Sequence, residues 1–321
     1  MWMPKVMIHD VNTPEVKGGR SRYKKKVLIQ LSNIGKRVLA QTLSFQSRRQ
    51  LTDMSKNWAL FTNAKQTELY AQYRPRYTEE VFKTIIDYCG ETSSDFHLAV
   101  DVGCGSGQST EPLAKHFRRV LGLDVSAMQI AKAPTNIPNC TFKVNKAEDL
   151  SSVKTGSADL VTVAQAFHWM DGEKFFAEVD RILKPGGSLI IYGYTTCSLT
   201  PKELDDYFQK FYHNVLPSYW TGGRKAVEDS YTCFSIPYEG WKRNDEMKIE
   251  KDLSIDEFVG YLGSWSAVNE YNQKNPPGNI LETVQHELKN INQSINKTDN
   301  KHATDLRVTW PVFMLMGHKP K

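Results

Sequence analysis

The sequence predicts a three-layer α/β fold with a doubly wound, seven-stranded and mostly parallel sheet, on three observations. Short apolar runs alternate with helical patterns from Asp95 to Tyr194, as in parallel sheets that helices cover on both faces. The first of these runs ends in a glycine-rich turn. An aromatic-rich segment then separates the fifth run from the end of the chain. We therefore expect an open α/β core with a helical cap inserted before the last strands.

The first predicted strand, residues 97–103, leads into the glycine-rich turn and then into a helix over residues 111–117. The turn contains Gly103, Gly105 and Gly107. Glycines let the backbone approach a ligand without Cβ clashes, and free amides at a helix start face the ligand's polar groups. Asp101 in the strand either orients this turn or contacts the ligand. The turn is therefore a candidate ligand site.

Three more strands are expected over residues 118–126, 140–150 and 158–170. Their carboxyl ends meet at the edge where ligands of open α/β sheets bind. The candidate residues that they bring to this edge are Asp124, Ala147, Glu148, Gln165, His168 and Trp169. Asp124 follows Gly107 by 17 residues, and an acid at this place in doubly wound nucleotide folds accepts the ribose hydroxyls. A ligand with a ribose is therefore expected.

A helix over residues 175–183 and a Pro-Gly turn over residues 184–187 precede the fifth strand, residues 188–194. About a hundred aromatic-rich residues then delay the last two strands, which favours a cap over the ligand edge. The closing strand, residues 307–317, is expected to pair antiparallel, with Pro311 at an edge or a bulge.

Charge is distributed unevenly along the chain. Residues 1–53 hold 11 Lys and Arg against three acids, a net charge of +8, whereas the remainder holds 30 against 33, a net charge of −3. The basic segment is expected to be a disordered extension, with a mitochondrial targeting segment, nucleic-acid contact and a non-native extension as alternatives. The chain has no apolar run of 18 residues and no C-x-x-C pair, which favours a soluble, cytoplasmic protein with reduced thiols.

Five motifs occur in order: VDVGCGSG, the acid Asp124, an AED turn, AFHW and LKPGG. Their order and spacing resemble those of class I S-adenosylmethionine-dependent methyltransferases with a type 11 domain. The G-x-G-x-G spacing also differs from the G-x-G-x-x-G of nicotinamide enzymes. More narrowly, YAQYRPRY, QAFHWMD and GYLGSWSAVNEY resemble the trans-aconitate methyltransferase-like group, over most of residues 57–318.

This resemblance implies a Rossmann-like class I methyltransferase domain with S-adenosyl-L-methionine as its cofactor. It implies that the methionine lies near Gly103 to Gly107 and Gln165, the ribose on Asp124, and the adenine beside Ala147 and Glu148. The domain over residues 54–321 would comprise a helical lid over 54–94, a cofactor-binding core over 95–194, a substrate cap over 195–300 and a closing strand over 301–321.

The methyl acceptor is expected to be a small molecule. By the resemblance, Arg74 in the lid pairs with the methionine carboxylate or with an anionic substrate; otherwise it stacks on a tyrosine. His168 is a general base for an amine or phenol, a hydrogen-bond donor to a carboxylate, or a support for its loop. A carboxylate acceptor needs basic and hydroxyl anchors instead of a base. Further substrate candidates are Tyr73, Arg76, Trp169, Trp265, Ser266, Tyr271 and Arg307.

Transfer of a methyl group from a sulfonium depends on positioning and on the exclusion of water, so no metal is expected. Two other classes remain as alternatives. A nucleic-acid methyltransferase is disfavoured by the net negative charge outside the first 53 residues, and a non-catalytic S-adenosylmethionine-binding protein is compatible with the same fold. A monomer or weak oligomer without a membrane span is expected.

Overall fold

The computed structural model describes residues 72–220, 222–299 and 306–321. Contacts divide the chain into two units, residues 1–50 and 51–321, and all described residues belong to the second unit. The predicted basic extension over residues 1–53 therefore lies outside the described residues, as does the first part of the predicted lid, residues 54–71.

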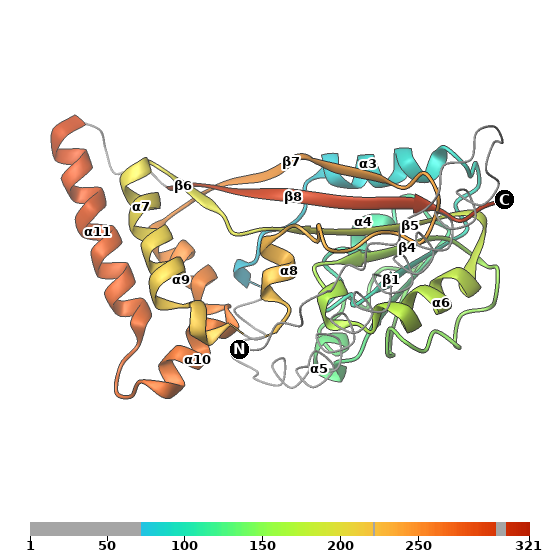
Figure 1. The fold of residues 1–321 in the computed structure, drawn as a ribbon, viewed down its shortest axis with the longest axis horizontal. Coiled ribbons are helices and arrows are strands. Elements are labelled where there is room, and N and C mark those ends of the chain that lie inside the picture. The colour runs from blue at the N-terminus through green and yellow to red at the C-terminus, as the bar shows by residue number, and fades with distance from the viewer. Residues whose placement is uncertain (1–71, 221, 300–305) are drawn as a thin grey trace, which may run out of the picture. The chain divides into compact units, whose positions relative to one another are not determined.

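The core of the second unit is an eight-stranded sheet with the order β3-β2-β1-β4-β5-β8-β6, in which β7 also pairs with β8 (Figure 1). The strands are β1 (Leu98–Val102), β2 (Arg119–Asp124), β3 (Cys140–Val144), β4 (Ala158–Ala164), β5 (Leu183–Tyr194), β6 (Ser198–Thr200), β7 (Lys242–Leu253) and β8 (Leu306–His318). The first five pair in parallel, and β8 pairs antiparallel to β5. The predicted α/β fold is confirmed, and the short β6 accounts for the eighth strand.

Helices cover both faces of the sheet. The helices are α3 (Glu79–Gly90), α4 (Thr110–Leu113), α5 (Ala127–Ile130), α6 (Gly172–Ile182), α7 (Lys202–Lys210), α8 (Arg224–Glu228), α9 (Ile255–Gly263), α10 (Ser266–Lys274) and α11 (Ile280–Asp299). Apolar residues of α3 join one buried cluster and those of α6 join another. Figure 1 shows these two helices on opposite sides of the sheet.

Strand β8 shows why the sheet needs cover on both faces. Val312 and Met314 belong to the same cluster as α3, whereas Phe313 and Leu315 belong to the cluster of α6. Successive side chains of a strand point to opposite faces, so an uninterrupted apolar run is buried from both sides. The strand therefore fixes the two layers against each other.

The segment 195–300 differs from the predicted cap in one respect. It is not helical throughout, because β7 lies in its middle and pairs along β8 from Lys242↔Met316 to Leu253↔Leu306. Helices α7 and α8 precede this strand, and α9, α10 and α11 follow it. The cap thus consists of two helical parts joined by strand β7 of the sheet. Of the last two strands, only β8 follows the whole cap, whereas β7 lies within it.

Candidate functional site

The glycine-rich turn between β1 and α4 depends on glycine for its shape. Gly103, Gly105 and Gly107 all have positive φ angles, of 72°, 55° and 88°. A Cβ on Gly103 would lie 2.6 Å from the Cβ of Ala166, in the loop after β4, whereas a Cβ on Gly105 would meet no atom within 4 Å. The turn is therefore packed on one side and open at Gly105, as a surface against which a ligand lies must be.

The backbone amides of this turn are largely used within the protein. Those that donate to protein acceptors belong to Gly103, Cys104, Gly105, Gly107, Thr110 and Glu111. Helix α4 has only four residues, from Thr110 to Leu113. These amides are therefore engaged within the protein, and the expectation that free amides at a helix start bind the ligand stays a prediction. The glycines also allow close approach of a ligand to the turn.

Asp124 ends β2 beside the turn. Its Oδ2 accepts the amide of Gly105 at 2.8 Å, and its Oδ1 accepts the amide of Ser126 at 2.8 Å. Burial raises the pKa of this carboxyl, and the two backbone hydrogen bonds oppose that rise. A carboxylate offers about four acceptor positions, so each oxygen retains one for an outside donor. Asp124 can therefore hold the glycine turn and a ligand's hydroxyl groups together.

Asp101 is fully buried beneath the turn. Its Oδ2 accepts the hydroxyl of Thr110 at 2.6 Å and its Oδ1 accepts the hydroxyl of Thr162, in β4, at 2.9 Å. Burial raises its pKa to about 6. These contacts tie β1, β4 and the start of α4 together, which favours the orienting role over contact with a ligand.

The loop after β4 begins with a strained residue. Gln165 has a φ angle of 57°, in the region that favours glycine. Its side-chain oxygen accepts the amide of Tyr194 at 2.8 Å, and its Nε2 donates to the carbonyl of Tyr194 at 2.9 Å. The side chain thus extends the pairing of β4 with β5, and the strain turns the chain sharply beside Gly103.

Arg74 reaches the same sheet edge from the segment before α3. Its Nε donates to the hydroxyl of Ser264 at 2.9 Å, and an Nη donates to the hydroxyl of Tyr194 at 3.4 Å. Its guanidinium also lies 5.5 Å from the ring centre of Tyr261. Arg74 therefore links β5 to the turn between α9 and α10. This arrangement includes the stacking on a tyrosine that the sequence left as an alternative.

His168 and Glu148 support the loop after β4. The Nδ1 of His168 lies 2.5 Å from the hydroxyl of Tyr231, and burial lowers the pKa of this histidine to about 3, assisted by the nearby charge of Arg224. Glu148 accepts the amide of Asp171 at 2.9 Å and so fixes the start of α6. Such contacts fit a supporting histidine better than a general base, because a base must accept a proton near neutral pH.

The other predicted substrate residues are dispersed. Arg307 is exposed and forms two hydrogen bonds with Asp252, on the neighbouring strand β7, at 2.8 and 3.0 Å. Trp265 is buried within the cap, and the Tyr271 ring lies 4.9 Å from that of Tyr219. The remaining substrate candidates are exposed or half-buried, namely Tyr73, Arg76, Trp169 and Ser266. Ala147, which the resemblance places beside the adenine, is also half-buried. The structure does not gather these side chains at one place.

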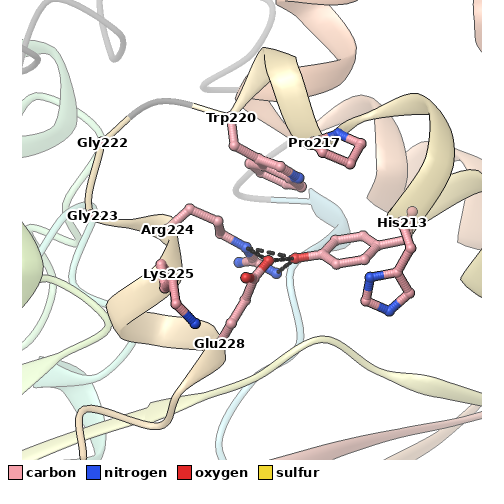
Figure 2. A pocket seen from close by; sticks show the side chains of 9 residues that line it. His213, Pro217, Trp220, Gly222, Gly223, Arg224, Lys225 and Glu228 are labelled. Atoms are coloured by element: carbon pink, nitrogen blue, oxygen red, sulfur yellow. Dashed lines mark hydrogen bonds and ion pairs between the residues drawn. The ribbon is translucent and has the colours of Figure 1, made fainter. Parts of the chain in front are cut away.

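A cavity of about 330 Å³ lies in the cap, between α8 and the turns η3 (Phe211–Val215) and η4 (Pro217–Tyr219) (Figure 2). Its lining includes Tyr212, Trp220, Arg224 and Glu228. Figure 2 shows the Trp220 ring above the Arg224 side chain, and this side chain donates to the hydroxyl of Tyr212. The sequence gives no sign of the role of Arg224, because a single arginine after two glycines forms no recognisable motif.

This pocket adjoins the loop after β4. A Cβ on Gly223 would lie 3.0 Å from Cδ2 of His168 and 3.2 Å from its carbonyl oxygen. Two residues earlier in that loop, Ala166 contacts Gly103 of the glycine turn. One short loop therefore separates the cap pocket from the glycine turn, so a ligand at each place would be a close neighbour of the other.

Comparison with known proteins identifies the family. A methyltransferase domain model matches residues 100–191, which contain β2 to β4 and parts of β1 and β5. A "putative methyltransferase" of Dictyostelium discoideum is 32% identical over 252 residues, and the match covers 78% of this chain and 92% of the relative. The chain belongs to the S-adenosylmethionine-dependent methyltransferase family.

A solved structure agrees with this assignment. The methyltransferase described here has a TM-score of 0.65 and 31% identity to a "putative type II methyltransferase" from Anaeromyxobacter dehalogenans, over 77% of this chain and 99% of that one. Trans-aconitate 2-methyltransferase of Deinococcus radiodurans matches only in part, at 40% identity over 29% of this chain and 36% of its own length. The family is thus established, whereas the similarity to trans-aconitate 2-methyltransferase covers only part of each chain.

The residues at the sheet edge fit S-adenosylmethionine, the methyl donor of this methyltransferase. The open face at Gly105 leaves room that a side chain would fill, and Asp124 keeps acceptor capacity for ribose hydroxyls. Within the described ranges, no helix is long and apolar enough to cross a membrane.

Proposed function

We propose that this methyltransferase acts on a small molecule and that the atom that receives the methyl group is a carboxylate oxygen. The observation that carries the proposal is the cap pocket of about 330 Å³ beside the loop after β4. This volume lies at the lower end of the range typical of small-molecule sites. A nucleic acid instead needs a positively charged surface, and residues 54–321 carry a net charge of −3.

The state of His168 favours a carboxylate over an amine or a phenol. When bound, S-adenosylmethionine supplies a methyl carbon on a positively charged sulfur, and as the acceptor oxygen bonds to that carbon the electrons of the C–S bond stay on the sulfur. A carboxylate is ionised at neutral pH and has no proton to lose. An amine or phenol requires a base, and a buried histidine with a pKa of about 3 is a weak one.

The chain's own contribution would then be positioning. The glycine turn and Asp124 hold the donor, the loop from Gln165 to Trp169 borders both the donor site and the acceptor pocket, and the cap helices exclude water from that pocket. Placing two reactants in contact in a dry site supplies most of what transfer from a sulfonium requires. Asp101 acts indirectly, by holding the turn against β4.

The donor half of the proposal is tested by calorimetry with S-adenosylmethionine. Asp124→Ala should weaken donor binding by about 10- to 100-fold, because it removes charge-assisted hydrogen bonds to the ribose. The matched control is Asp205→Ala. This half-buried aspartate accepts the amide of Leu199 at 2.9 Å in the cap, away from the glycine turn. Equal donor affinity for wild type and Asp124→Ala would refute the ribose assignment.

The acceptor half is tested with methyl-labelled donor and a panel of small carboxylic acids, amines and phenols. The label should enter an acid as a base-labile methyl ester. Labelling of amines or phenols alone would refute the carboxylate assignment and keep the small-molecule one. Donor binding without labelling of any panel member would point instead to the non-catalytic or nucleic-acid alternative.

A further inference from the structure

We propose that Arg224 binds an anionic group of the methyl acceptor in the cap pocket, and that it thereby selects anionic acceptors. This inference rests on the proposed small-molecule function and adds the specificity residue and its ligand chemistry. It makes Arg224 a binding residue that no sequence motif indicates, and it places the acceptor between α8 and the turns η3 and η4.

Arg224 is held in a fixed orientation. Its Nη2 donates to the hydroxyls of Thr196, at 2.6 Å, and of Tyr212, at 2.7 Å, and its Nε donates to the same Tyr212 hydroxyl at 2.9 Å. A guanidinium has five N–H donors. Its Nη1 forms no hydrogen bond with a residue that the structure describes. With the side chain 18% exposed, this nitrogen remains available to a ligand in a preorganised position.

Aromatic rings flank the guanidinium. Its central carbon lies 4.5 Å from the ring centre of Trp220 and 5.5 Å from that of Tyr212. Behind them, Trp265 is buried with its ring 5.3 Å from Trp220 and 5.6 Å from Tyr212. The pocket therefore combines a charged donor with flat apolar walls, which suits a small acceptor with an acidic group and a short apolar or planar body.

The charges of the lining favour an anion over a cation. Arg224 and Lys225 are positive, and Glu228 is the acid among the described lining residues. That carboxylate is already engaged, because it accepts the hydroxyl of Tyr212 and lies 3.4 Å from Nε of Arg224. A cationic amine would thus find the Glu228 carboxylate already hydrogen-bonded, and the positive charge of Arg224 would repel it. An anion instead gains a charge-assisted hydrogen bond.

The pocket lies where a methyl acceptor must bind. Thr196, which holds Arg224, follows the carboxyl end of β5 by two residues. Gly223 contacts His168, in the loop after β4. The segments that follow the carboxyl ends of the neighbouring strands β4 and β5 therefore both lie beside the pocket. A methyl acceptor bound at Arg224 would therefore lie beside the loop after β4, which also contacts the glycine turn where the donor is expected.

The test measures acceptor kinetics with small mono- and dicarboxylic acids, their matched carboxamides, and phenyl phosphate as a competing anion. Arg224→Gln should raise the KM for the best acid by about 10- to 100-fold, because one charge-assisted contact is lost. It should also abolish the preference for acid over carboxamide and the inhibition by phenyl phosphate. Arg224→Lys should recover part of the acid affinity, since it restores the charge without the planar fork.

Arg243→Gln is the matched control. Arg243 lies on β7, outside the pocket, and its side chain is buried to a similar extent. Its Nη2 donates to the carbonyl of Ser230 at 2.7 Å. Donor affinity, measured by calorimetry, reports whether each variant keeps its fold. An unchanged KM in Arg224→Gln, or an equal rise in the control, overturns the proposal. Labelling restricted to neutral or cationic acceptors overturns the anion site but leaves a small-molecule methyltransferase. No labelling of any small molecule overturns both.

Discussion

His168 illustrates how burial decides the chemistry of a single residue. Its ring lies beneath Gly223 and beside the hydroxyl of Tyr231, where a charged imidazolium would lose its hydration. The pKa of this histidine is therefore lowered to about 3, with the nearby charge of Arg224 as a second cause. The residue stays neutral throughout the physiological pH range.

This shift predicts acid sensitivity. The folded-state pKa of about 3 lies below the ordinary histidine value of 6.5, so between these values the unfolded chain binds a proton that the folded chain does not. Stability therefore falls as the pH falls below 6.5. From pH 7 to pH 4.5, the wild type should lose roughly 2 to 3 kcal/mol more unfolding free energy than His168→Gln. Urea denaturation at several pH values measures the difference.

The exposed His286→Gln is the control for removing one imidazole. If His168→Gln and the wild type lose the same stability as the pH falls, burial does not lower the pKa of His168. The kcat of His168→Gln adds a second measurement. Retention of a substantial kcat near neutral pH agrees with a supporting residue, whereas a loss of about a thousandfold or more would restore the general base.

Individual residues differ in how far the sequence reveals them. Asp124 and the three glycines occupy fixed places in a motif, so their position at the sheet edge follows from the order of strand, turn and helix. The environment of Asp101 depends on Thr162, 61 residues away, and that of Arg224 on Thr196 and Tyr212. Contacts between distant segments are not encoded in local spacing, and they decide these roles.

At the scale of elements, two glycines in different loops allow the effect of backbone strain to be distinguished from the effect of ligand contact. Gly105 has a φ angle of 55° and Gly156, in the loop before β4, has one of 61°. A Cβ at either position meets no atom within 4 Å. The two sites are thus alike in conformation and space, and differ in whether a donor is expected beside them.

Substitution by alanine at these two sites should therefore give different results. Gly105→Ala and Gly156→Ala should each lose about 1 kcal/mol of stability from the left-handed backbone. Only Gly105→Ala should weaken S-adenosylmethionine binding, by at least about tenfold, since its methyl group enters the donor space. Thermal unfolding and calorimetry measure the two effects. Equal donor affinities in both variants would place the donor elsewhere.

Strand β7 shows why an element escapes prediction. Its sequence KRNDEMKIEKDL is mostly charged, and only Met247, Ile249 and Leu253 are buried. Two of these alternate with exposed residues, a short half-buried pattern that is weak beside so many charges. The strand forms because β8 supplies the partner backbone along its whole length. Tertiary pairing here outweighs local propensity.

For the whole molecule, the methyltransferase domain should work without the basic extension. The chain divides between residues 50 and 51, and the motifs of the donor site lie in the second unit. A protein that comprises residues 54–321 should keep its donor affinity and its small-molecule turnover within about twofold of the full chain. Calorimetry and labelling assays on both forms make the comparison.

Loss of turnover in the shorter protein would give the extension a part in catalysis. If full-length protein also binds nucleic acid, with an affinity that falls steeply as salt rises, the nucleic-acid alternative gains support, because release of counterions produces that dependence. A salt-independent result in both forms leaves the small-molecule function in place.

The position of β8 has a consequence during synthesis on the ribosome. The strand follows the other described strands in the sequence, yet it lies between β5 and β7 in the sheet. Until residues 306–318 leave the exit tunnel, β5 and β7 have no common partner and their edges are open to other chains. A stop codon ahead of residue 306 would therefore release a protein with the donor motifs intact, an unfinished sheet, and a strong tendency to aggregate.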